Sequence, residues 1–282
     1  MPSTYTPLRY PGGKTKMYNF IQEIINLNDL HDLYVEPFAG GAGLALKLLI
    51  KHDVKRILIN DSDRAIFCFW KCVLNFADEL CEFIDTVPLD METWNKQRQI
   101  YLNKEACSDI EVGMATLYLN RTNISGIVKG GVIGGLRQDG MYKMDARFNR
   151  ETLIKKIKTI ASYKEYIDIC NYDVFLFLNS KIIKKQQNAL INFDPPYVNK
   201  GGQLYMNYFK EEDHIRLEEK IEKIGNNWIV TYDDSDLIRD RYSGFRQSLM
   251  DICYSARTAR SAKELVVFSD NLKIPSAVKI AN

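Results

Sequence analysis

An apolar run that ends in two prolines constrains this chain more than any other feature. Ala189 to Phe193 is apolar except for one Asn, a pattern typical of a buried strand. Pro195 and Pro196 have no backbone N–H to donate, so the strand must stop next to Asp194. The run therefore predicts a strand of an α/β sheet with an acid at its carboxyl edge, where open α/β sheets bind their ligands.

Each residue of Asp194-Pro195-Pro196-Tyr197 has a chemical use at such an edge. A carboxylate accepts a hydrogen bond from an exocyclic amine, and prolines fix the neighbouring carbonyls without adding N–H donors. The tyrosine ring offers a flat face to a planar base. The alternative interpretation is a strand that ends in a proline turn with an incidental acid. The remaining motifs of the chain favour the functional hypothesis.

Composition sets broad limits. The 282 residues, 46% of them hydrophobic, suit one large domain or a core domain with an insertion. A formal net charge of +2 neither indicates nor excludes nucleic acid, so the distribution of charge must decide. The six cysteines form no Cys-x-x-Cys pair and the three histidines are scattered, so no metal site is predicted. With a polar N-terminus and no apolar run of membrane-spanning length, we expect a reduced, cytoplasmic, soluble protein without membrane contact.

A glycine turn follows a second predicted strand. Leu33 to Glu36 is a short apolar run that leads through Pro37-Phe38-Ala39-Gly40-Gly41-Ala42-Gly43 into a helical segment, the beginning of a nucleotide-binding βαβ unit. The spacing is not that of the dinucleotide fingerprint. The next strand, Arg56 to Asn60, ends at Asp61, where such folds hold ribose hydroxyls. The alternative for this acid is a helix cap, a role that Asp63 suits better.

A basic segment lies between the glycine turn after Glu36 and the Asp194-Pro195-Pro196-Tyr197 motif. Residues 120–160 contain nine Lys/Arg and three Asp/Glu, together with two pairs of glycines. Such a segment can approach a phosphate backbone and base edges. The alternative is an exposed hairpin with a solvated charged face. A second, smaller basic patch, made by Arg257, Arg260 and Lys263, is expected between the two closing strands, Arg246 to Tyr254 and Glu264 to Ser269.

Together these motifs resemble the adenine-N6 DNA methyltransferases of the DNA adenine methylase family, alpha group. The resemblance covers most of the chain. The cofactor motif comes first, the basic segment second and the catalytic motif third, the order that marks the alpha group. The segments that carry it are Arg9-Tyr10-Pro11-Gly12-Gly13-Lys14, Val35-Glu36-Pro37-Phe38-Ala39-Gly40-Gly41-Ala42-Gly43, Asn60-Asp61, Tyr118-Leu119-Asn120-Arg121-Thr122 and Asp194-Pro195-Pro196-Tyr197.

The resemblance implies an enzyme that transfers a methyl group from S-adenosylmethionine to N6 of a flipped-out adenine in duplex DNA. It implies an α/β fold with a Rossmann-like methyltransferase sheet, helices on both faces, and an inserted, mostly helical target-recognition domain with a hairpin. We expect residues 1–78 and 164–282 to form the catalytic domain and residues 79–163 the insertion. A cognate restriction endonuclease is an expected partner, and the enzyme is expected to act as a monomer.

Individual roles follow from the same resemblance. Asp194 would accept from the target amino group, helped by the Pro195 carbonyl, and Tyr197 would stack on the base. The predicted catalytic residues are Asp194, Pro195, Pro196 and Tyr197. The predicted cofactor-binding residues are Tyr10, Lys14, Glu36, Phe38, Gly40, Asp61 and Asp194. Tyr10 stands where the family more often has tryptophan.

In the basic segment, residue types suggest two kinds of DNA contact. Lys129, Lys143 and Arg147 are predicted to contact phosphates. Arg121, Asn123, Ser125 and Arg137 are predicted to reach base edges, because short polar side chains and arginine forks suit major-groove donors and acceptors. The segment Thr122-Asn123-Ile124-Ser125 departs from the aromatic-rich version in the adenine methylases that read GATC, so no target sequence is assigned.

Two alternatives stay open at this stage. The first is methylation of adenine in RNA or of a protein amide, since related Asp/Asn-Pro-Pro-Tyr motifs serve several planar substrates; the basic segment favours DNA. The second is a non-catalytic DNA-binding relative, against which the presence of the expected catalytic residues argues.

Overall fold

The computed structural model describes residues 4–10, 12–180, 188–198, 209–256, 258–276, 278 and 280–281, with backbone alone for 251–256, 258–262 and 280–281. The chain forms two compact units. The helical unit comprises Met1–Gly13 and Asp63–Glu165, and the sheet unit comprises Lys14–Ser62 and Tyr166–Asn282. The predicted insertion, residues 79–163, thus lies inside a larger unit that also includes the N-terminal segment.

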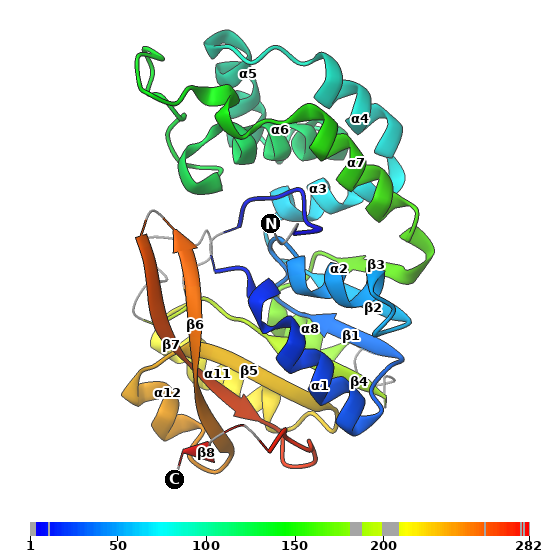
Figure 1. Ribbon diagram of the computed structural model, residues 1–282, viewed down its shortest axis with the longest axis vertical. Coiled ribbons are helices and arrows are strands. Elements are labelled where there is room, and N and C mark those ends of the chain that lie inside the picture. The colour runs from blue at the N-terminus through cyan, green and yellow to red at the C-terminus, as the bar shows by residue number, and fades with distance from the viewer. Residues whose placement is uncertain are drawn as a thin grey trace. The chain divides into compact units, whose positions relative to one another are not determined.

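The sheet unit is built on one eight-stranded sheet, visible in Figure 1. The strands are β1 Leu33–Glu36, β2 Arg56–Asn60, β3 Ile167–Cys170, β4 Ala189–Phe193, β5 Asn227–Asp233, β6 Arg246–Ala256, β7 Thr258–Phe268 and β8 Ile280–Ala281. Their order is β3-β2-β1-β4-β5-β7-β6-β8. The strands from β3 to β5 in this order are parallel, whereas β7, β6 and β8 join antiparallel.

The strand order reverses between β1 and β4. From β1 the chain builds outward through β2 and β3, and from β4 it builds outward through β5 on the opposite side. Every residue of β1 and β4 is buried, because both strands lie inside the sheet and are covered on both faces. Their apolar sequences follow from this burial, and the strands predicted at these positions are confirmed. The reversal makes the carboxyl ends of β1 and β4 the topological switch point, where ligands bind in open α/β sheets.

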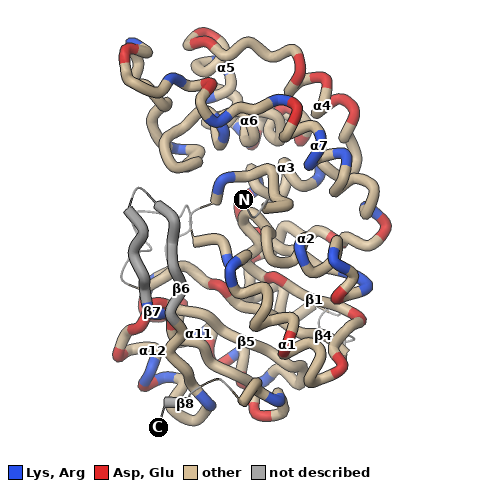
Figure 2. The backbone as a smooth tube through the Cα atoms, in the orientation of Figure 1, with Lys and Arg blue, Asp and Glu red and all other residues tan. Residues whose placement is uncertain are grey.

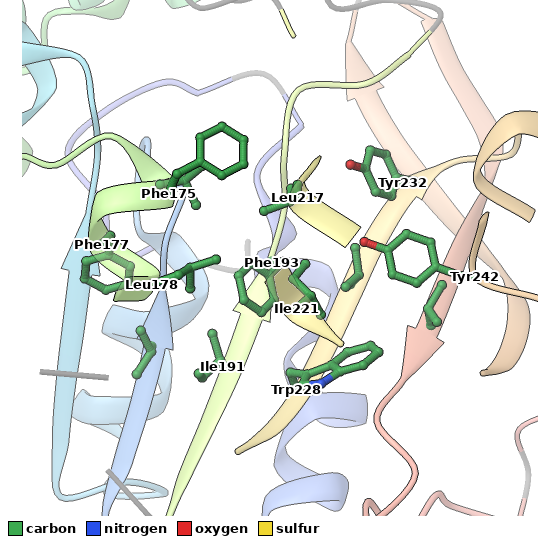
Figure 3. Packing of buried hydrophobic residues seen from close by; sticks show 14 of the residues in the cluster. Phe175, Phe177, Leu178, Ile191, Phe193, Leu217, Ile221, Trp228, Tyr232 and Tyr242 are labelled. Atoms are coloured by element: carbon green, nitrogen blue, oxygen red, sulfur yellow. The ribbon is translucent and has the colours of Figure 1, made fainter. Parts of the chain in front are cut away.

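Helices cover both faces of the sheet, as the sequence predicts. Figure 1 shows α1 and α2 in front of the strands and α8 and α11 behind them. These helices span α1 Tyr18–Asn28, α2 Gly43–Ile50, α8 Val174–Asn179 and α11 Glu211–Ile221, and the short α12 spans Asp236–Arg241. Behind the sheet, Phe177 of α8 and Ile221 of α11 belong to one buried cluster with Phe193 and Trp228 from the strands (Figure 3). This apolar layer fixes β4, the strand that leads to Asp194.

The helical unit is organised around a central helix, α6. Its helices are α3 Arg64–Asn75, α4 Ala77–Thr86, α5 Met91–Leu102, α6 Asp109–Thr122 and α7 Arg150–Ala161. A capping box between Ser108 and Glu111 begins α6. A Cβ atom at Gly113 would lie 2.3 Å from the Cys72 sulfur, so glycine lets α3 and α6 pack closely. Cys68 and Cys72 are therefore core residues of this contact.

Two features differ from the sequence-based expectation. In the basic segment, the described loop is closed by one antiparallel bridge, Asn123 to Val132, instead of the ladder of a full hairpin. Gly134 and Gly135 there have φ angles of 88° and 74°, which interrupt extended backbone. In the sheet unit, β6 and β7 continue through the segment expected to connect them. Arg257 and the Arg260 side chain lie outside the described residues.

Within the described ranges, no helix combines the length and the apolar character needed to span a membrane.

Candidate active site and nucleic-acid interface

Two acids occupy the switch-point edge of the sheet unit. Glu36 is the last residue of β1, and Asp194 follows the last residue of β4, the neighbouring strand. Glu36 is buried, and the Asp194 side chain is 24% exposed. Pro195 and Pro196 are buried directly after Asp194 and end the strand. The fold thus brings together two of the predicted site carboxylates, one of which remains open to solvent.

Lys14 lies at the centre of a buried polar network at this edge. Its ammonium is 2.7 Å from Asp194 Oδ1 and donates to the Tyr197 hydroxyl at 2.8 Å. The Tyr197 hydroxyl in turn donates to Glu264 Oε1, and the ammonium is 3.5 Å from the same oxygen. The Thr231 hydroxyl lies 3.3 Å from Asp194 Oδ1. The Asp194-Pro195-Pro196-Tyr197 motif is therefore held by charged contacts from Lys14 of the N-terminal motif and from Glu264 of strand β7.

Burial gives these carboxylates an unusual affinity for protons. It raises the pKa of Glu36 to about 8, with a further contribution from the Asp194 charge. It also raises the pKa of Asp194 and the pKa of Glu264, in both cases against the opposing charge of Lys14. Asp194 and Glu264 thus share the ammonium of Lys14, and Glu36 is a third carboxyl at the same edge that responds to the Asp194 charge. Such a site favours a ligand that brings positive charge, because a cation would stabilise their ionised forms.

The glycine turn after β1 is closed by backbone and carboxylate contacts. The Gly40 N–H donates to Asp61 Oδ2 at 2.8 Å, and Gly40 has a φ angle of 45° in the left-handed region. The N–H of Ala45, in the first turn of α2, donates to Glu36 Oε1 at 3.2 Å. Asp63, not Asp61, caps α3 by accepting from the Ala65 N–H. The prediction that Asp63 is the helix cap is therefore confirmed.

The remaining predicted cofactor residues divide between the units. The Phe38 ring packs edge-on against Phe209, with ring centroids 5.8 Å apart. Tyr10 belongs to the helical unit, where its carbonyl accepts from the Gly13 N–H at 3.4 Å. Pro11 of the same motif lies outside the described residues, as do residues 201–208 after the Asp194-Pro195-Pro196-Tyr197 motif.

In the helical unit, Asn120 ties the N-terminal segment to α6. Its side-chain oxygen accepts from the Arg9 N–H at 2.8 Å. Its amide nitrogen donates to the Arg9 carbonyl at 2.9 Å and to the Gly126 carbonyl at 2.7 Å. The side chain is buried, so these bonds fix Arg9 beside the start of the basic loop.

Four cations gather around this point. Arg121 donates to the Arg147 carbonyl at 2.7 Å, and Arg9 donates to the Asn123 carbonyl at 3.1 Å. Burial and the charges of Arg9 and Arg147 lower the pKa of Arg121 to about 10. Burial likewise lowers the pKa of Arg9, with Arg147 adding, and the pKa of Lys156, with Arg121 adding. Of the ion pairs among described residues, none joins these four to a carboxylate.

We call Arg9, Arg121, Arg147 and Lys156 the cation cluster. Like charges held together without carboxylates disfavour one another, and a bound anion would relieve the repulsion. The cluster therefore has the electrostatics of an anion site. It is a local feature, since blue Lys and Arg segments and red Asp and Glu segments are interspersed along both units in Figure 2.

Most of the predicted DNA-binding residues are accessible. Ser125, Lys129, Lys143 and Arg147 have exposed side chains, and Arg137 is exposed but paired with Asp139 at 3.0 Å. Exposed apolar side chains accompany them: Leu136, Met141 and Tyr142 are 71%, 92% and 63% exposed. The basic loop thus presents mixed basic and apolar side chains to solvent.

Arg121 is only partly exposed, and Asn123 does not reach the surface, so the prediction that Asn123 reaches a base edge is wrong. The residue is fully buried. Its oxygen accepts from the Trp94 indole at 2.7 Å, and its nitrogen lies 2.9–3.1 Å from three loop carbonyls, those of Ile127, Val128 and Gly130. The side chain organises the loop from within, because it satisfies backbone groups that have no ladder partners.

Residues 10–255 match the model of the D12 class N6 adenine-specific DNA methyltransferase family. The chain belongs to this family. Among curated proteins, it is similar to the Type II methyltransferase M.MjaIII of Methanocaldococcus jannaschii, with 26% identity over 267 residues that cover 84% of this chain and 88% of that protein. Among solved structures, it overlaps the rRNA methyltransferase aviRa of Streptomyces viridochromogenes with 10% identity and a TM-score of 0.37, over 92% of this chain and 85% of that chain.

Membership in this methyltransferase family confirms the predicted resemblance and establishes adenine-specific DNA methylation as the activity. One residue at the switch-point edge of the sheet was not among the predicted site residues. Glu264 is 1% exposed and contacts both Lys14 and Tyr197. The sequence contains one indication of this residue, because an acid directly precedes the apolar run Leu265 to Phe268. A charged side chain at the start of such a buried run costs stability unless it is paired.

The buried position of Asn123 generates a stability prediction. Asn123→Ala leaves the Trp94 indole and loop carbonyls without partners, so the free energy of unfolding should fall by about 1–3 kcal/mol. Ser125→Ala, two residues along the same loop and exposed, is the matched control and should leave the urea midpoint unchanged. An Asn123→Ala variant as stable as the parent would contradict the proposed role in the loop.

Proposed function

We propose that this protein is a site-specific, S-adenosylmethionine-dependent methyltransferase that methylates N6 of adenine flipped out of duplex DNA, with Asp194 as the group that accepts from the amino nitrogen. The observation that carries this proposal is the position of Asp194. It is a partly exposed carboxylate at the topological switch point, held by Lys14 and Thr231. Membership in an adenine-specific DNA methyltransferase family supports the substrate.

Methyl transfer to N6 requires an amino nitrogen that is more nucleophilic than that of free adenine. The N6 lone pair is delocalised into the ring, so the amino nitrogen attacks an electrophile poorly. Hydrogen bonds from its two N–H groups to the Asp194 carboxylate and to the Pro195 carbonyl would favour a more tetrahedral, more nucleophilic nitrogen. The Tyr197 ring would hold the base by stacking. Much of the acceleration then comes from orientation of the amine against the methyl donor.

The residues of the sheet unit fit S-adenosylmethionine, which supplies a methyl group on a positively charged sulfur. Asp194 and Glu264 share the ammonium of Lys14, and Glu36 is a third buried carboxyl at the same edge, so a cationic ligand would be stabilised beside them. In the turn that begins α2, Gly40 and Phe38 would line the pocket. Asp61, which holds the Gly40 N–H, would bind the ribose hydroxyls.

The helical unit supports DNA as the macromolecular substrate. We assign the cation cluster to a backbone phosphate, because its charge lacks carboxylate partners among the described residues. The cluster includes Arg147, a predicted phosphate contact, and Arg121, for which this assignment replaces the predicted contact with a base edge. Lys129 and Lys143 would contact further phosphates, and Ser125 and Arg137 base edges. The duplex hides adenine N6, so the base must leave the stack before reaction.

Partners and assembly belong to the same proposal. The relative from Methanocaldococcus jannaschii is named a Type II methyltransferase, which supports a cognate restriction endonuclease that cuts the unmethylated site. We also propose that the enzyme acts as a monomer.

The direct test is methyl transfer from labelled S-adenosylmethionine to duplex DNA, RNA and protein side by side. We expect incorporation into DNA as N6-methyladenine. Asp194→Ala should lower the rate by about 10²-fold or more, because a positioned group that activates the nucleophile is lost. Asp168→Ala, which removes a half-exposed acid on β3, is the control. Near-normal turnover by Asp194→Ala, or incorporation only into RNA or protein, would refute the proposal.

Cofactor binding should depend on pH through Glu36. In the free protein this carboxyl keeps its proton up to pH about 8, and a cation bound beside it favours the ionised form. Binding should therefore release a proton at pH 7, and affinity should rise as the pH approaches 8. Calorimetric titration in two buffers of different ionisation enthalpy measures the release. Glu36→Gln should abolish it; equal enthalpies in both buffers for the parent protein would rule the mechanism out.

DNA binding should depend on salt through the basic loop. Lys129→Ala and Lys143→Ala should each weaken binding to all sequences alike and lower the slope of log affinity against log salt by about 0.9. Lys51→Ala, an exposed lysine after α2 in the sheet unit, should leave the slope unchanged. The assignment fails if the loop variants and this control have the same slope as the parent.

A further inference from the structure

The burial of Glu264 within the sheet has an energetic cost. It lies on β7 directly opposite Asp233 of the antiparallel neighbour β5. Both acids are buried, with exposed fractions of 1% and 9%. Like charges directly opposite each other destabilise a sheet. A buried acid also costs stability unless it is fully hydrogen-bonded, and within the described residues Glu264 Oε2 is buried without a hydrogen-bond partner.

The contacts that Glu264 does make lead to the catalytic motif. Its Oε1 accepts from the Tyr197 hydroxyl, and Lys14 Nζ lies 3.5 Å away. Lys14 therefore stands between two carboxylates, with Asp194 Oδ1 at 2.7 Å. Because the lysine side chain is long and flexible, a small shift moves its ammonium toward either acid. The unpartnered Oε2 of Glu264 adds an acceptor for that shift.

Sharing of this ammonium matters for Asp194. A carboxylate that neutralises an ammonium alone has less negative charge to offer an incoming amine, and is a weaker acceptor. A carboxylate without any cation in this buried site would instead take up a proton and lose its acceptor function. An ammonium shared between two acids keeps Asp194 ionised without neutralising its charge fully, so that Asp194 can still accept a hydrogen bond.

We propose that Glu264 is a positioning residue that shares the Lys14 ammonium with Asp194, so that Asp194 stays ionised and still accepts strongly from the adenine amino group. This inference rests on the proposed role of Asp194. Glu264 itself does not contact the substrate. It acts through Lys14, whose charge it shares, and through Tyr197, whose hydroxyl it holds.

The first experiment compares Glu264→Gln with Glu264→Asp in single-turnover methylation of DNA. Glutamine keeps the shape and can still accept from Tyr197, but it gives up the charge. Aspartate keeps the charge. We expect Glu264→Gln to slow methyl transfer about tenfold, because a neutral acceptor replaces a charged one and leaves the ammonium to Asp194 alone, and Glu264→Asp to slow it less. Cofactor and DNA dissociation constants should stay within about twofold. The opposite order, with aspartate slower, would assign Glu264 to holding Tyr197 alone.

The second experiment repeats the Glu264→Gln change in a Lys14→Met background. With the ammonium gone there is nothing to share, so the added change should no longer slow the reaction. Lys14→Met alone should itself be slow at neutral pH and recover as pH rises, because Asp194 must then ionise without a cation. A further tenfold loss in the double variant would show that Glu264 acts independently of Lys14 and would overturn the inference.

The outcomes also separate this inference from the proposed function. If the parent protein methylates adenine in DNA and Glu264→Gln does so at the parent rate, the inference is wrong and the function stands. If the parent protein does not methylate DNA, both are wrong. Should Glu264→Gln fail to fold, the Lys14→Met pH profile decides: a rate that does not recover with rising pH contradicts the dependence of Asp194 on the shared ammonium.

Discussion

The parallel pairing of β1 with β4 is the constraint on which the rest of this structure depends. Leu33 pairs with Ala189 and Val35 with Ile191, in strands that are buried along their whole length. A strand covered on both faces has no interior position for an exposed polar side chain. Charged chemistry is therefore confined to the strand ends, and the shared register brings the ends that carry Glu36 and Asp194 to the same edge.

Burial at this edge also makes the protonation of the carboxylates sensitive to the charge of a bound ligand. In water Glu36 would be ionised at neutral pH, whereas here its pKa is about 8 and it responds to the charge of whatever binds beside it. Groups of this kind cost folding stability, as do the opposed acids on β5 and β7. The apolar layer behind the sheet, with Phe193 and Trp228 at its centre, offsets that cost and holds β4 in place (Figure 3).

Sequence patterns predicted the parts of this fold in which one physical effect dominates. The buried strands were predictable because apolar runs with sharp ends leave few alternatives, and the Asp63 cap because a local hydrogen bond decides it. Asn123 was mistaken for a surface residue because composition around it is basic, while its own burial depends on Trp94, distant in sequence. Glu264 was missed for the same reason, since its partners Lys14 and Tyr197 come from other parts of the chain.

The N-terminal segment connects the two kinds of chemistry along the chain. Arg9 is fixed by Asn120 within the cation cluster of the helical unit, and five residues later Lys14 holds Asp194 in the sheet unit. Gly12, between them, has a φ angle of 79°, which any residue with a side chain adopts only under strain. The chain thus carries a residue of the cation cluster and the ammonium paired with Asp194 only five positions apart in sequence.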